Sequence, residues 1–356
     1  MGIIPLTLDN MVFSLQKTGG GSVYWQNLST SCLADGRFDV SFVERGDART
    51  NSNRQAMDLG GASFYADKGL PLRVDEVRSV SECSKGLFHS SFYRYASAPN
   101  VINITTVHDF ICMKQYSGLL KWFSFWQIKR AVLHSDAIIC ISESTKRDLL
   151  EYIPEAARRM ITVIPQGFSS AYSYKRCERK NQAVFIGARN VAYKNFKKAV
   201  ESVRLVDGLR LAIIGAPLSS DEKAYLDEVL PGRFVSYEYP STSEVCDIFR
   251  ESLALLYLSE YEGFGIPPLE AMSSGLPVIA LRASSIPEVV GDAAVLLEEA
   301  DPGSVAATLR SFEEQGDFFD GRVARGLSRA KEYSWEKTAA RTRDFYAEVW
   351  NKLGGC

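Results

Sequence analysis

Residues that build metal clusters and covalent cross-links are scarce in this sequence of 356 residues. It contains seven cysteines and three histidines, and no two cysteines are spaced as a C-x-x-C pair. An odd number of scattered cysteines argues against both a disulfide scaffold and a zinc site. We therefore expect a protein of a reducing compartment.

Long hydrophobic runs and a strong net charge are missing as well. No stretch reaches the ~20 apolar residues that a bilayer-spanning helix needs, and the first residues lack the basic and apolar regions of a secretory signal peptide. The formal net charge of −2 gives no overall attraction for nucleic acid or for an anionic membrane. These absences predict a cytoplasmic protein without a nucleic-acid partner, in which any membrane contact is local and peripheral.

What the chain does contain is an alternation of short apolar runs and amphipathic stretches. This pattern predicts an α/β protein with parallel sheets whose strands are buried on both faces. Because 356 residues exceed one ordinary core, we expect two such domains. The predicted strands cover residues 103–107, 136–141, 160–164, 182–186, 210–214, 254–258 and 277–280. The predicted helices cover residues 22–33, 143–152, 195–203, 243–252, 268–274 and 334–352.

The domain boundary is expected in a polar, basic segment without helical or strand period. We predict a Rossmann-like domain over residues 1–168, a linker over 169–181, a second Rossmann-like domain over 182–333 and a C-terminal helix within 334–356. The aromatic residues of that helix predict that it packs on an apolar surface: Trp335, Phe345, Tyr346 and Trp350.

A basic loop follows the predicted strand 182–186. It begins at Gly187, contains Arg189 and Lys194, and leads into a predicted helix. Ligands of open α/β sheets bind at the carboxyl ends of strands, where helix N-termini favour anions. Arg189 and Lys194 are therefore candidates for binding a diphosphate. The alternative is a solvated loop with two ordinary cations.

Two further polar features lie in the N-terminal half. Gly19–Gly21 precedes a predicted helix, where the glycines could bring backbone close to a ligand or could simply form a tight turn. His108 ends the predicted strand 103–107 and is placed to hydrogen-bond a polar ligand. His89 and His134 are expected to be structural.

The most distinctive stretch is residues 259–272, SEYEGFGIPPLEAM. Its glycines permit unusual backbone angles, and its two prolines suit the first turn of a helix. Glu270 can be explained as a carboxylate in that first turn, where the helix dipole stabilises it by about 0.5 kcal/mol. Glu262, on the loop before the helix, has no such explanation.

The segment EGFGIPPLE resembles the E-x7-E motif of family-4 retaining glycosyltransferases, which have the GT-B fold. The segments GARNVAYKN, TVHDF, ICISESTKRDLL and VIPQG also resemble that family, and LDNMVFSLQKTGGGSVYWQNL is similar to members that build bacterial surface polysaccharides. The resemblance covers nearly the whole chain. It implies two doubly wound domains that face a central cleft, with the C-terminal helix crossing back to the N-terminal domain.

The resemblance also implies a role for each candidate site residue. Glu270 would hold the ribose hydroxyls of a nucleotide sugar, and Glu262 would face the donor sugar. Arg189 and Lys194 would neutralise the diphosphate, and His108 would hydrogen-bond the sugar from the N-terminal domain. The other implied donor contacts are Gly20, Gly21, Gly187, Gly263, Phe264, Gly265 and Ile266.

The implied reaction transfers a sugar from a nucleoside diphosphate sugar to an acceptor hydroxyl, with retention at the anomeric carbon. GDP-mannose is the first candidate for the donor, and UDP-sugars and dTDP-rhamnose are alternatives. The implied acceptor is a glycan or an undecaprenyl-linked glycan, used in O-antigen, capsule or lipopolysaccharide synthesis at the inner face of the cytoplasmic membrane. A non-catalytic glycan- or nucleotide-binding protein of the same fold is the alternative from another class.

Two details bear on this resemblance. The sequence contains no D-x-D, the metal-diphosphate motif of the other large glycosyltransferase fold, so we expect no metal and no further cofactor. Gln166 stands where the family usually has Asn, before the glycine that precedes the linker.

Residues 114–130, KQYSGLLKWFSFWQIKR, combine four cations with five aromatic rings. This composition is typical of an amphipathic helix at a membrane interface. The alternative is that Trp122, Phe123, Phe125 and Trp126 pack in the core of the N-terminal domain. A lipid-linked acceptor would agree with the first interpretation.

Overall fold

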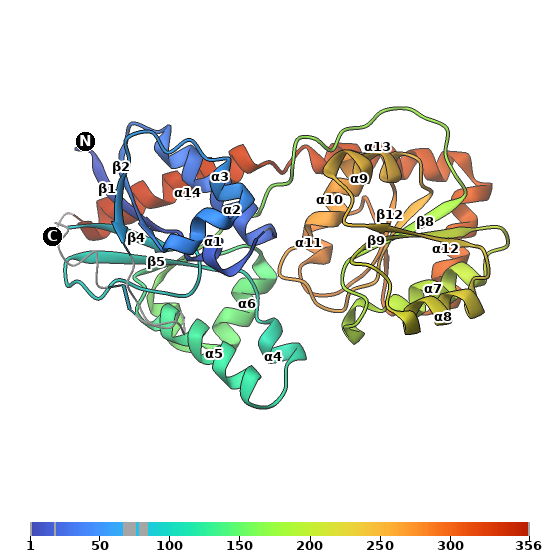
Figure 1. The fold of residues 1–356 in the computed structure, drawn as a ribbon, viewed down its shortest axis with the longest axis horizontal. Helices are drawn as coiled ribbons and strands as arrows, with labels where there is room; N and C mark the ends of the chain where they lie inside the picture. Colours follow the sequence, from blue (N-terminus) through green and yellow to red (C-terminus); the bar gives the residue numbers. More distant parts are fainter. Residues whose placement is uncertain (1, 18, 67–75, 78–84, 355–356) are drawn as a thin grey trace. The chain divides into compact units, whose positions relative to one another are not determined.

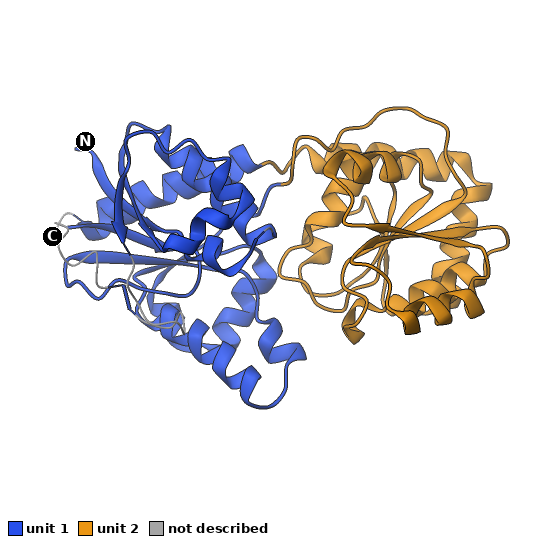
Figure 2. Cartoon of the chain, viewed as in Figure 1, with its two compact units in different colours: residues 1–167, 335–356 blue, residues 168–334 orange. Residues whose placement is uncertain are grey.

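The computed structural model describes residues 2–17, 19–66, 76–77 and 85–354 (Figure 1). The chain divides into two compact units, the first made of Met1–Gly167 and Trp335–Cys356 and the second of Phe168–Ser334 (Figure 2). Each unit is built around one parallel sheet with helices on both faces, which confirms the predicted α/β class.

A sheet of seven described strands forms the centre of the first unit. The order is β3-β2-β1-β4-β5-β6-β7, and it reverses between β1 and β4, as in doubly wound sheets. The strands are β1 (Ile4–Asp9), β2 (Phe38–Glu44), β3 (Ser63–Ala66), β4 (Gly86–Ser90), β5 (Val101–Val107), β6 (Ala137–Cys140) and β7 (Met160–Val163). The α-helices are α1 (Met11–Leu15), α2 (Gly20–Leu33), α3 (Ser52–Gln55), α4 (Ile111–Gln115), α5 (Gly118–Leu133), α6 (Glu143–Tyr152) and α14 (Trp335–Val349).

The second unit has a sheet of six described strands in the order β10-β9-β8-β11-β12-β13, which reverses between β8 and β11. In Figure 1, α7, α8 and α12 cover one face of this sheet, and α9, α10 and α13 cover the other. The strands are β8 (Gln182–Ile186), β9 (Arg210–Gly215), β10 (Phe234–Glu238), β11 (Ala254–Tyr257), β12 (Val278–Leu281) and β13 (Val295–Leu297). The α-helices are α7 (Phe196–Arg204), α8 (Ser220–Val229), α9 (Thr242–Arg250), α10 (Ile266–Ser273), α11 (Ile286–Val290), α12 (Pro302–Glu314) and α13 (Gly316–Ala330).

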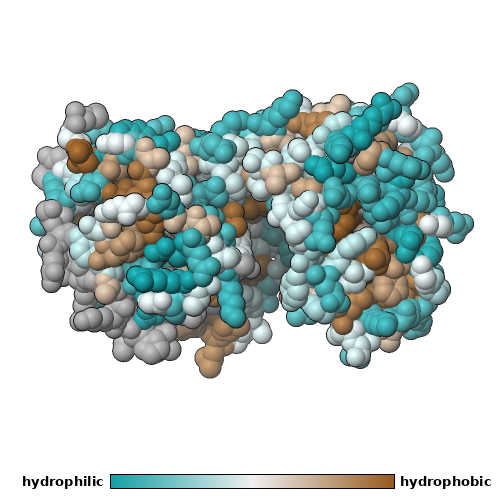
Figure 3. Space-filling view, turned by 45° about the horizontal axis from the view of Figure 1, so that its top comes forward, coloured by the Kyte–Doolittle hydropathy of each residue, from teal (hydrophilic) through white to brown (hydrophobic). Residues whose placement is uncertain are grey.

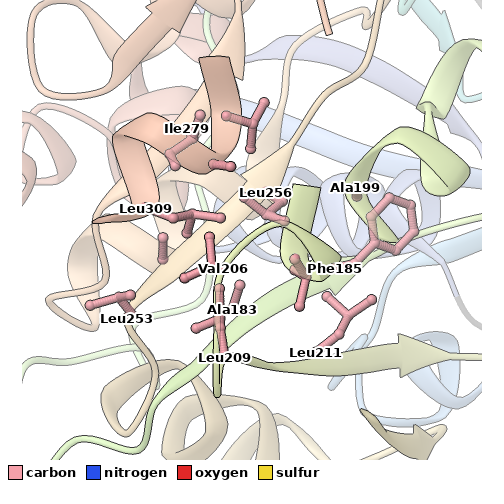
Figure 4. Packing of buried hydrophobic residues seen from close by; sticks show 14 of the residues in the cluster. Ala183, Phe185, Ala199, Val206, Leu209, Leu211, Leu253, Leu256, Ile279 and Leu309 are labelled. Atoms are coloured by element: carbon pink, nitrogen blue, oxygen red, sulfur yellow. The ribbon is translucent and has the colours of Figure 1, made fainter. Parts of the chain in front are cut away.

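The core of the second unit is a continuous layer of aliphatic and aromatic side chains (Figure 4). Phe185 of β8, Leu256 of β11, Ile279 of β12 and Leu309 of α12 all belong to it and are buried. Burying one such side chain contributes about 1.5–3 kcal/mol. The strands whose ends carry the candidate site therefore rest on a well-packed base.

The seven predicted strands all occur, with ends that agree within two residues. The strands that the prediction missed are edge strands, short strands or strands with polar residues. All four residues of β3 are at least partly exposed, those of β10 are partly or fully exposed, β13 has only three residues, and β1 contains Pro5 and Asp9. Such segments lack the continuous apolar run that identified the others.

The C-terminal helix α14 belongs to the first unit although it follows the second unit in the chain (Figure 2). Trp335 and Tyr346 are buried, as predicted. The Tyr346 hydroxyl lies 2.5 Å from Nδ1 of His89, and the Thr106 hydroxyl lies 2.9 Å from Nε2 of the same ring. Burial lowers the pKa of His89 to about 3, so this histidine is neutral and structural, as expected.

The segment 169–181 packs along the second unit, which corrects its prediction as a linker. Tyr172 is buried. The Arg179 guanidinium donates to the carbonyl of Ser252 after α9 and to that of Gly275 after α10. A polar side chain that satisfies distant backbone carbonyls leaves no periodic signal, so this packing could not be detected from the sequence pattern.

Helix α5 has apolar residues on two faces. Phe125 and Ile128 pack in the core of the first unit, whereas Trp122, Phe123 and Trp126 are 60%, 46% and 47% exposed. Core packing was the alternative considered for four rings of this helix, and it therefore accounts for Phe125 but not for the other three. Among the described residues, no helix combines the length and apolar character required to span a bilayer.

We expect Tyr346→Phe to destabilise the first unit by about 1–3 kcal/mol, because it leaves a ring nitrogen of buried His89 without its partner. All five tryptophans, at positions 25, 122, 126, 335 and 350, lie in the first unit. Tryptophan fluorescence during urea denaturation therefore reports on this unit alone. The control is Tyr239→Phe, at a position 75% exposed in the second unit. An unchanged midpoint for Tyr346→Phe would contradict the assigned role of the contact.

Candidate functional site

The loops that follow β8 and β11 meet where the strand order of the second sheet reverses. At such a point the connections that follow the two neighbouring strands run to opposite faces of the sheet. The crevice between these connections is where ligands of open α/β sheets bind. Lys194 lies on the loop after β8, and Glu262 lies on the loop after β11. The fold therefore brings these two predicted site residues to the same edge of the sheet.

Lys194 and Glu262 form an ion pair. Nζ of Lys194 lies 2.5 Å from Oε1 of Glu262, and the two side chains are only 16% and 15% exposed. The same ammonium group lies 5.3 Å from the ring centre of Tyr193 and 5.6 Å from that of Tyr257. Two aromatic rings and a carboxylate thus hold a cation in one position.

Asn195 joins the two loops independently of the ion pair. Its Nδ2 donates to the Leu258 carbonyl at 2.9 Å and to Oε1 of Glu260 at 3.0 Å. The Glu260 amide in turn donates to the Tyr193 carbonyl at 2.9 Å. The position of Lys194 therefore depends on backbone contacts between the loops as well as on its own charge.

Gly265 shapes the start of α10. It has a φ of +109°, and a Cβ at this position would lie 2.7 Å from Cδ1 of Ile286. A side chain would be strained by this backbone conformation, and Cδ1 of Ile286 would have to move to make room for it. The helix begins at Ile266 directly after this glycine.

Two serines, Ser284 and Ser285, hold the backbone of the glycine-containing loop. The amide of Glu262 donates to the Ser284 hydroxyl at 2.8 Å. The Ser285 hydroxyl lies 2.9 Å from the carbonyl of Glu262 and 2.7 Å from that of Phe264. The sequence prediction missed both serines, since a Ser-Ser pair before a short helix has no distinctive spacing.

Glu270 lies in the second turn of α10, so its interpretation as a helix-start acid is wrong. The helix begins at Ile266, and the two prolines occupy its second and third positions. Its carboxyl group hydrogen-bonds the Tyr172 hydroxyl, and burial raises its pKa to about 7. The helix dipole does not explain why Glu270 is buried at this position, because burying its charged form costs free energy. Tyr172 comes from the segment predicted to be a linker and was not predicted as a site residue.

Arg189 is bound to Glu222 at the start of α8. Nε of Arg189 lies 2.8 Å from Oε1 of Glu222, and its NH2 group lies 3.1 Å from Oε2 of the same residue and 2.9 Å from the Pro217 carbonyl. The guanidinium group lowers the pKa of Glu222. Arg189 is only 5% exposed. In this conformation the guanidinium group of Arg189 is therefore held by Glu222, and its predicted role at a diphosphate stays a prediction.

A cavity of about 710 Å³ opens beside Arg189. Its walls come from the loops after β8 and β9 and from the first turns of α7 and α8, and include Gly187, Gly215, Glu222 and Tyr225. Lys194, Glu262 and Glu270 do not line it. The candidate site residues of the second unit thus fall into two groups, one at the reversal point and one beside this cavity.

The candidate residues of the first unit follow β1 and β5. Gly20 and Gly21 are the first two residues of α2, where backbone N–H groups point out of the helix end. His108 is partly buried, and burial lowers its pKa to about 4, so its ring is neutral near pH 7. Nε2 of Gln166 lies 3.4 Å from Nδ1 of His108, in position to donate. In the tautomer in which Nδ1 of His108 accepts from this amide, the ring proton is on Nε2 and can be donated to a ligand.

Family comparisons match both units. Residues 18–171 match the family described as Glycosyltransferase Family 4, and residues 173–324 match Glycosyl transferases group 1. Each unit therefore matches a glycosyltransferase family. The two matches together reach from the glycine segment before α2 into α13, so they include the loops that carry the candidate site.

Several curated relatives are mannosyltransferases. O-antigen chain mannosyltransferase B of Escherichia coli is 37% identical over 99 residues, which are 28% of this chain and 26% of that protein. MMP alpha-(1->4)-mannosyltransferase of Mycolicibacterium hassiacum is 26% identical over 254 residues, 66% of this chain and 60% of that protein. O-antigen chain mannosyltransferase RfbU of Salmonella typhimurium is 25% identical over 228 residues, 62% of this chain and 64% of that protein. The match spans less than two thirds of each of these relatives.

Solved structures confirm the GT-B fold. Sucrose-phosphate synthase of Thermosynechococcus elongatus superposes with a TM-score of 0.78 at 16% identity, over 98% of this chain and 100% of that one. HepE of Anabaena, in complex with UDP and glucose, superposes with a TM-score of 0.70 at 13% identity, over 97% of this chain and 100% of that one.

We expect the second unit, which carries Glu270, to lose stability as this residue ionises. Its folded-state pKa of about 7 lies above the ordinary value of 4.5. The contribution of Glu270 to stability is therefore fully present below pH 4.5 and is lost as the pH rises towards 7. Glu270→Gln has no charge to bury, so it should equal the wild type at low pH and exceed it at about pH 8 by on the order of 2 kcal/mol.

Calorimetric unfolding of both proteins across this pH range measures the difference. Glu313→Gln, which replaces an exposed carboxylate in α12, is the control and should follow the wild type at every pH. A constant difference between Glu270→Gln and the wild type would show that the ionisation of Glu270 is not the cause.

Proposed function

We propose that this protein is a retaining glycosyltransferase that moves a sugar from a nucleoside diphosphate sugar to a hydroxyl group of a glycan or undecaprenyl-linked acceptor. The observation that carries this proposal is the Lys194–Glu262 ion pair at the reversal point of the second sheet, with Glu270 on the helix that follows. A fixed cation and two carboxyl groups match the chemistry of a diphosphate, a sugar and a ribose. The glycosyltransferase families of both units support it.

For the donor we propose GDP-mannose, within O-antigen or related surface-polysaccharide synthesis. Support comes from relatives that are named O-antigen chain mannosyltransferases. A UDP-sugar is the second candidate, because the structurally similar HepE was solved with UDP and glucose. dTDP-rhamnose is the third.

In the proposed reaction the bond between the anomeric carbon and the leaving phosphate oxygen breaks, and a bond from the same carbon to the acceptor oxygen forms on the same face. The acceptor proton passes to the departing diphosphate. Negative charge grows on that diphosphate in the transition state, and a positioned cation lowers the barrier most when it need not reorganise. Lys194, held by two rings and by Glu262, meets this requirement. The proposal therefore needs no metal ion.

The carboxyl groups have different proposed roles. Glu262 orients the donor sugar through its hydroxyl groups and supports the positive charge that develops on the sugar ring. Glu270 accepts hydrogen bonds from the ribose hydroxyls. The proposed role of His108, donation from Nε2 to the donor sugar, agrees with its neutral ring.

Arg189 can offer its whole guanidinium group to the diphosphate after it leaves Glu222. The present contacts occupy Nε and Nη2 of that group. We propose that a donor diphosphate replaces the Glu222 carboxylate as the partner of Arg189. Glu222 would then compete with the donor for the same cation.

The function is tested by measuring thermal stability with GDP, UDP and dTDP, followed by donor hydrolysis and transfer assays with the matching sugars. We expect GDP to raise the melting temperature most and GDP-mannose to be hydrolysed slowly without acceptor. A nucleotide that stabilises the protein without any sugar release or transfer would favour a non-catalytic binding protein. If no nucleotide stabilises the protein, the donor proposal fails.

We expect Lys194→Met to lower kcat for transfer about 100-fold, since a group that stabilises developing charge contributes about 3 kcal/mol. The matched control is Lys198→Met, an exposed lysine four residues later in α7, which should keep wild-type activity. Equal losses in both variants would point to a general charge effect and against the proposed role of Lys194.

We expect Glu222→Gln to tighten nucleoside diphosphate binding several-fold, because Gln holds the Arg189 cation less strongly than a carboxylate does. Arg189→Met should weaken the same binding. Isothermal titration calorimetry with the preferred nucleoside diphosphate measures both. If neither substitution changes the Kd, Arg189 and Glu222 serve only the packing of α8.

A further inference from the structure

One face of α5 carries large apolar side chains to the surface. Leu119, Trp122, Phe123 and Trp126 are spaced as i, i+3, i+4 and i+7, which places them along one side of the helix. They are 89%, 60%, 46% and 47% exposed. We call these four residues the aromatic face of α5.

This face is additional to the one that fixes α5 to its unit. Ile128, Ala131 and Val132 of the same helix are buried, and Phe125 packs against the same core. A helix on the surface of a monomeric protein ordinarily has a polar outer side, whereas a cluster of exposed rings marks a surface that another phase or molecule covers. In Figure 3, hydrophobic side chains reach the surface at the lower edge of the first unit, where Figure 1 has α4 and α5.

The segment that carries the aromatic face is basic. Between Asp109 and Asp136 the sequence has no acidic residue and contains Lys114, Lys121, Lys129 and Arg130. Lys114 and Lys129 have acidic partners outside this segment, Asp148 at 3.5 Å and Glu155 at 3.4 Å. Two of these cations accompany the exposed rings: Nζ of Lys121 lies 5.9 Å from the Trp122 ring centre, and the guanidinium carbon of Arg130 lies 5.5 Å from that of Trp126.

Exposed aromatic rings beside cations indicate which kind of partner covers this face. We propose that the aromatic face of α5 docks on the surface of a lipid bilayer that contains anionic lipids, with the helix axis in the plane of the membrane. Tryptophan rings prefer the interface between head groups and acyl chains, and lysine side chains extend their charge from there to the head groups. A protein partner or a second copy of this chain would need acidic groups to complement the same cations.

Docking by this face would bring the first unit to the membrane without any spanning segment. Leu119 and Leu120, at the N-terminal end of the helix, are 89% and 60% exposed and would enter the acyl region first. A lipid-linked acceptor moves in the same plane, so the inference agrees with the proposed acceptor but does not depend on the donor or on the reaction.

The test uses the full chain and sedimentation with vesicles of phosphatidylcholine alone or mixed with phosphatidylglycerol. We expect at least tenfold stronger binding to the mixed vesicles, weakened by salt because the head-group attraction is screened. The triple variant Trp122→Ser, Phe123→Ser, Trp126→Ser should lose this binding, and so should the double variant Lys121→Glu, Trp122→Ser. The control Ile3→Ser removes an apolar side chain that is 67% exposed in the same unit, and it should bind as the wild type does.

Two further measurements keep the result unambiguous. Circular dichroism must show that the variants fold. Nucleotide binding by the triple variant should stay at the wild-type level, because the aromatic face is separate from the proposed donor site. Failure of the donor proposal would appear in the nucleotide binding of the wild type and would leave vesicle binding unchanged. Equal vesicle binding by the wild type and the triple variant, or no binding by either, overturns the inference. A wild-type dimer that becomes a monomer in the triple variant, without vesicle binding, assigns the face to a second copy of the chain instead.

Discussion

The ion pair between Lys194 and Glu262 is the contact on which the candidate site depends. Both side chains are mostly removed from water, so either charge alone would carry a desolvation cost that its partner offsets. The pair also joins the loops of two neighbouring strands, and Asn195 repeats that connection through the backbone. In the proposed reaction, the donor diphosphate would therefore meet a cation that is already in place.

The charge balance of the second unit follows from this arrangement. Lys194 is neutralised by Glu262, and Arg189 is neutralised by Glu222. Glu270 is hydrogen-bonded to Tyr172, and burial raises its pKa, so it holds its proton to higher pH. Each of these two cations thus has an internal carboxylate as partner, and at Arg189 the proposed donor diphosphate has to compete with that carboxylate. Such competition lowers the affinity for the anionic ligand. In return, the free protein has no unpaired charge buried at these two positions.

The sequence predicted the parallel strands well because they are buried on both faces, which leaves an uninterrupted apolar run as in β8 and β11. It also indicated the loops of Lys194 and Glu262, since ligand sites of such sheets lie at strand ends. It could not show that Arg189 turns to Glu222, because side-chain pairing over 33 residues leaves no periodic trace. Nor could it decide the surroundings of Glu270. The start of α10 depends on the φ of Gly265, and a shift of two residues moves a carboxyl group from an exposed first turn to a buried second one.

The return of α14 to the first unit has a consequence for the order of folding. Tyr346 completes the surroundings of His89, although 257 residues separate the two in the chain. During synthesis the second unit is translated before α14, so until then the first unit lacks the helix that packs on α2, and Nδ1 of His89 lacks Tyr346. The first unit to be translated is thus the last to be finished. A nascent chain stalled before Trp335 would leave the side of α2 that contacts α14 uncovered.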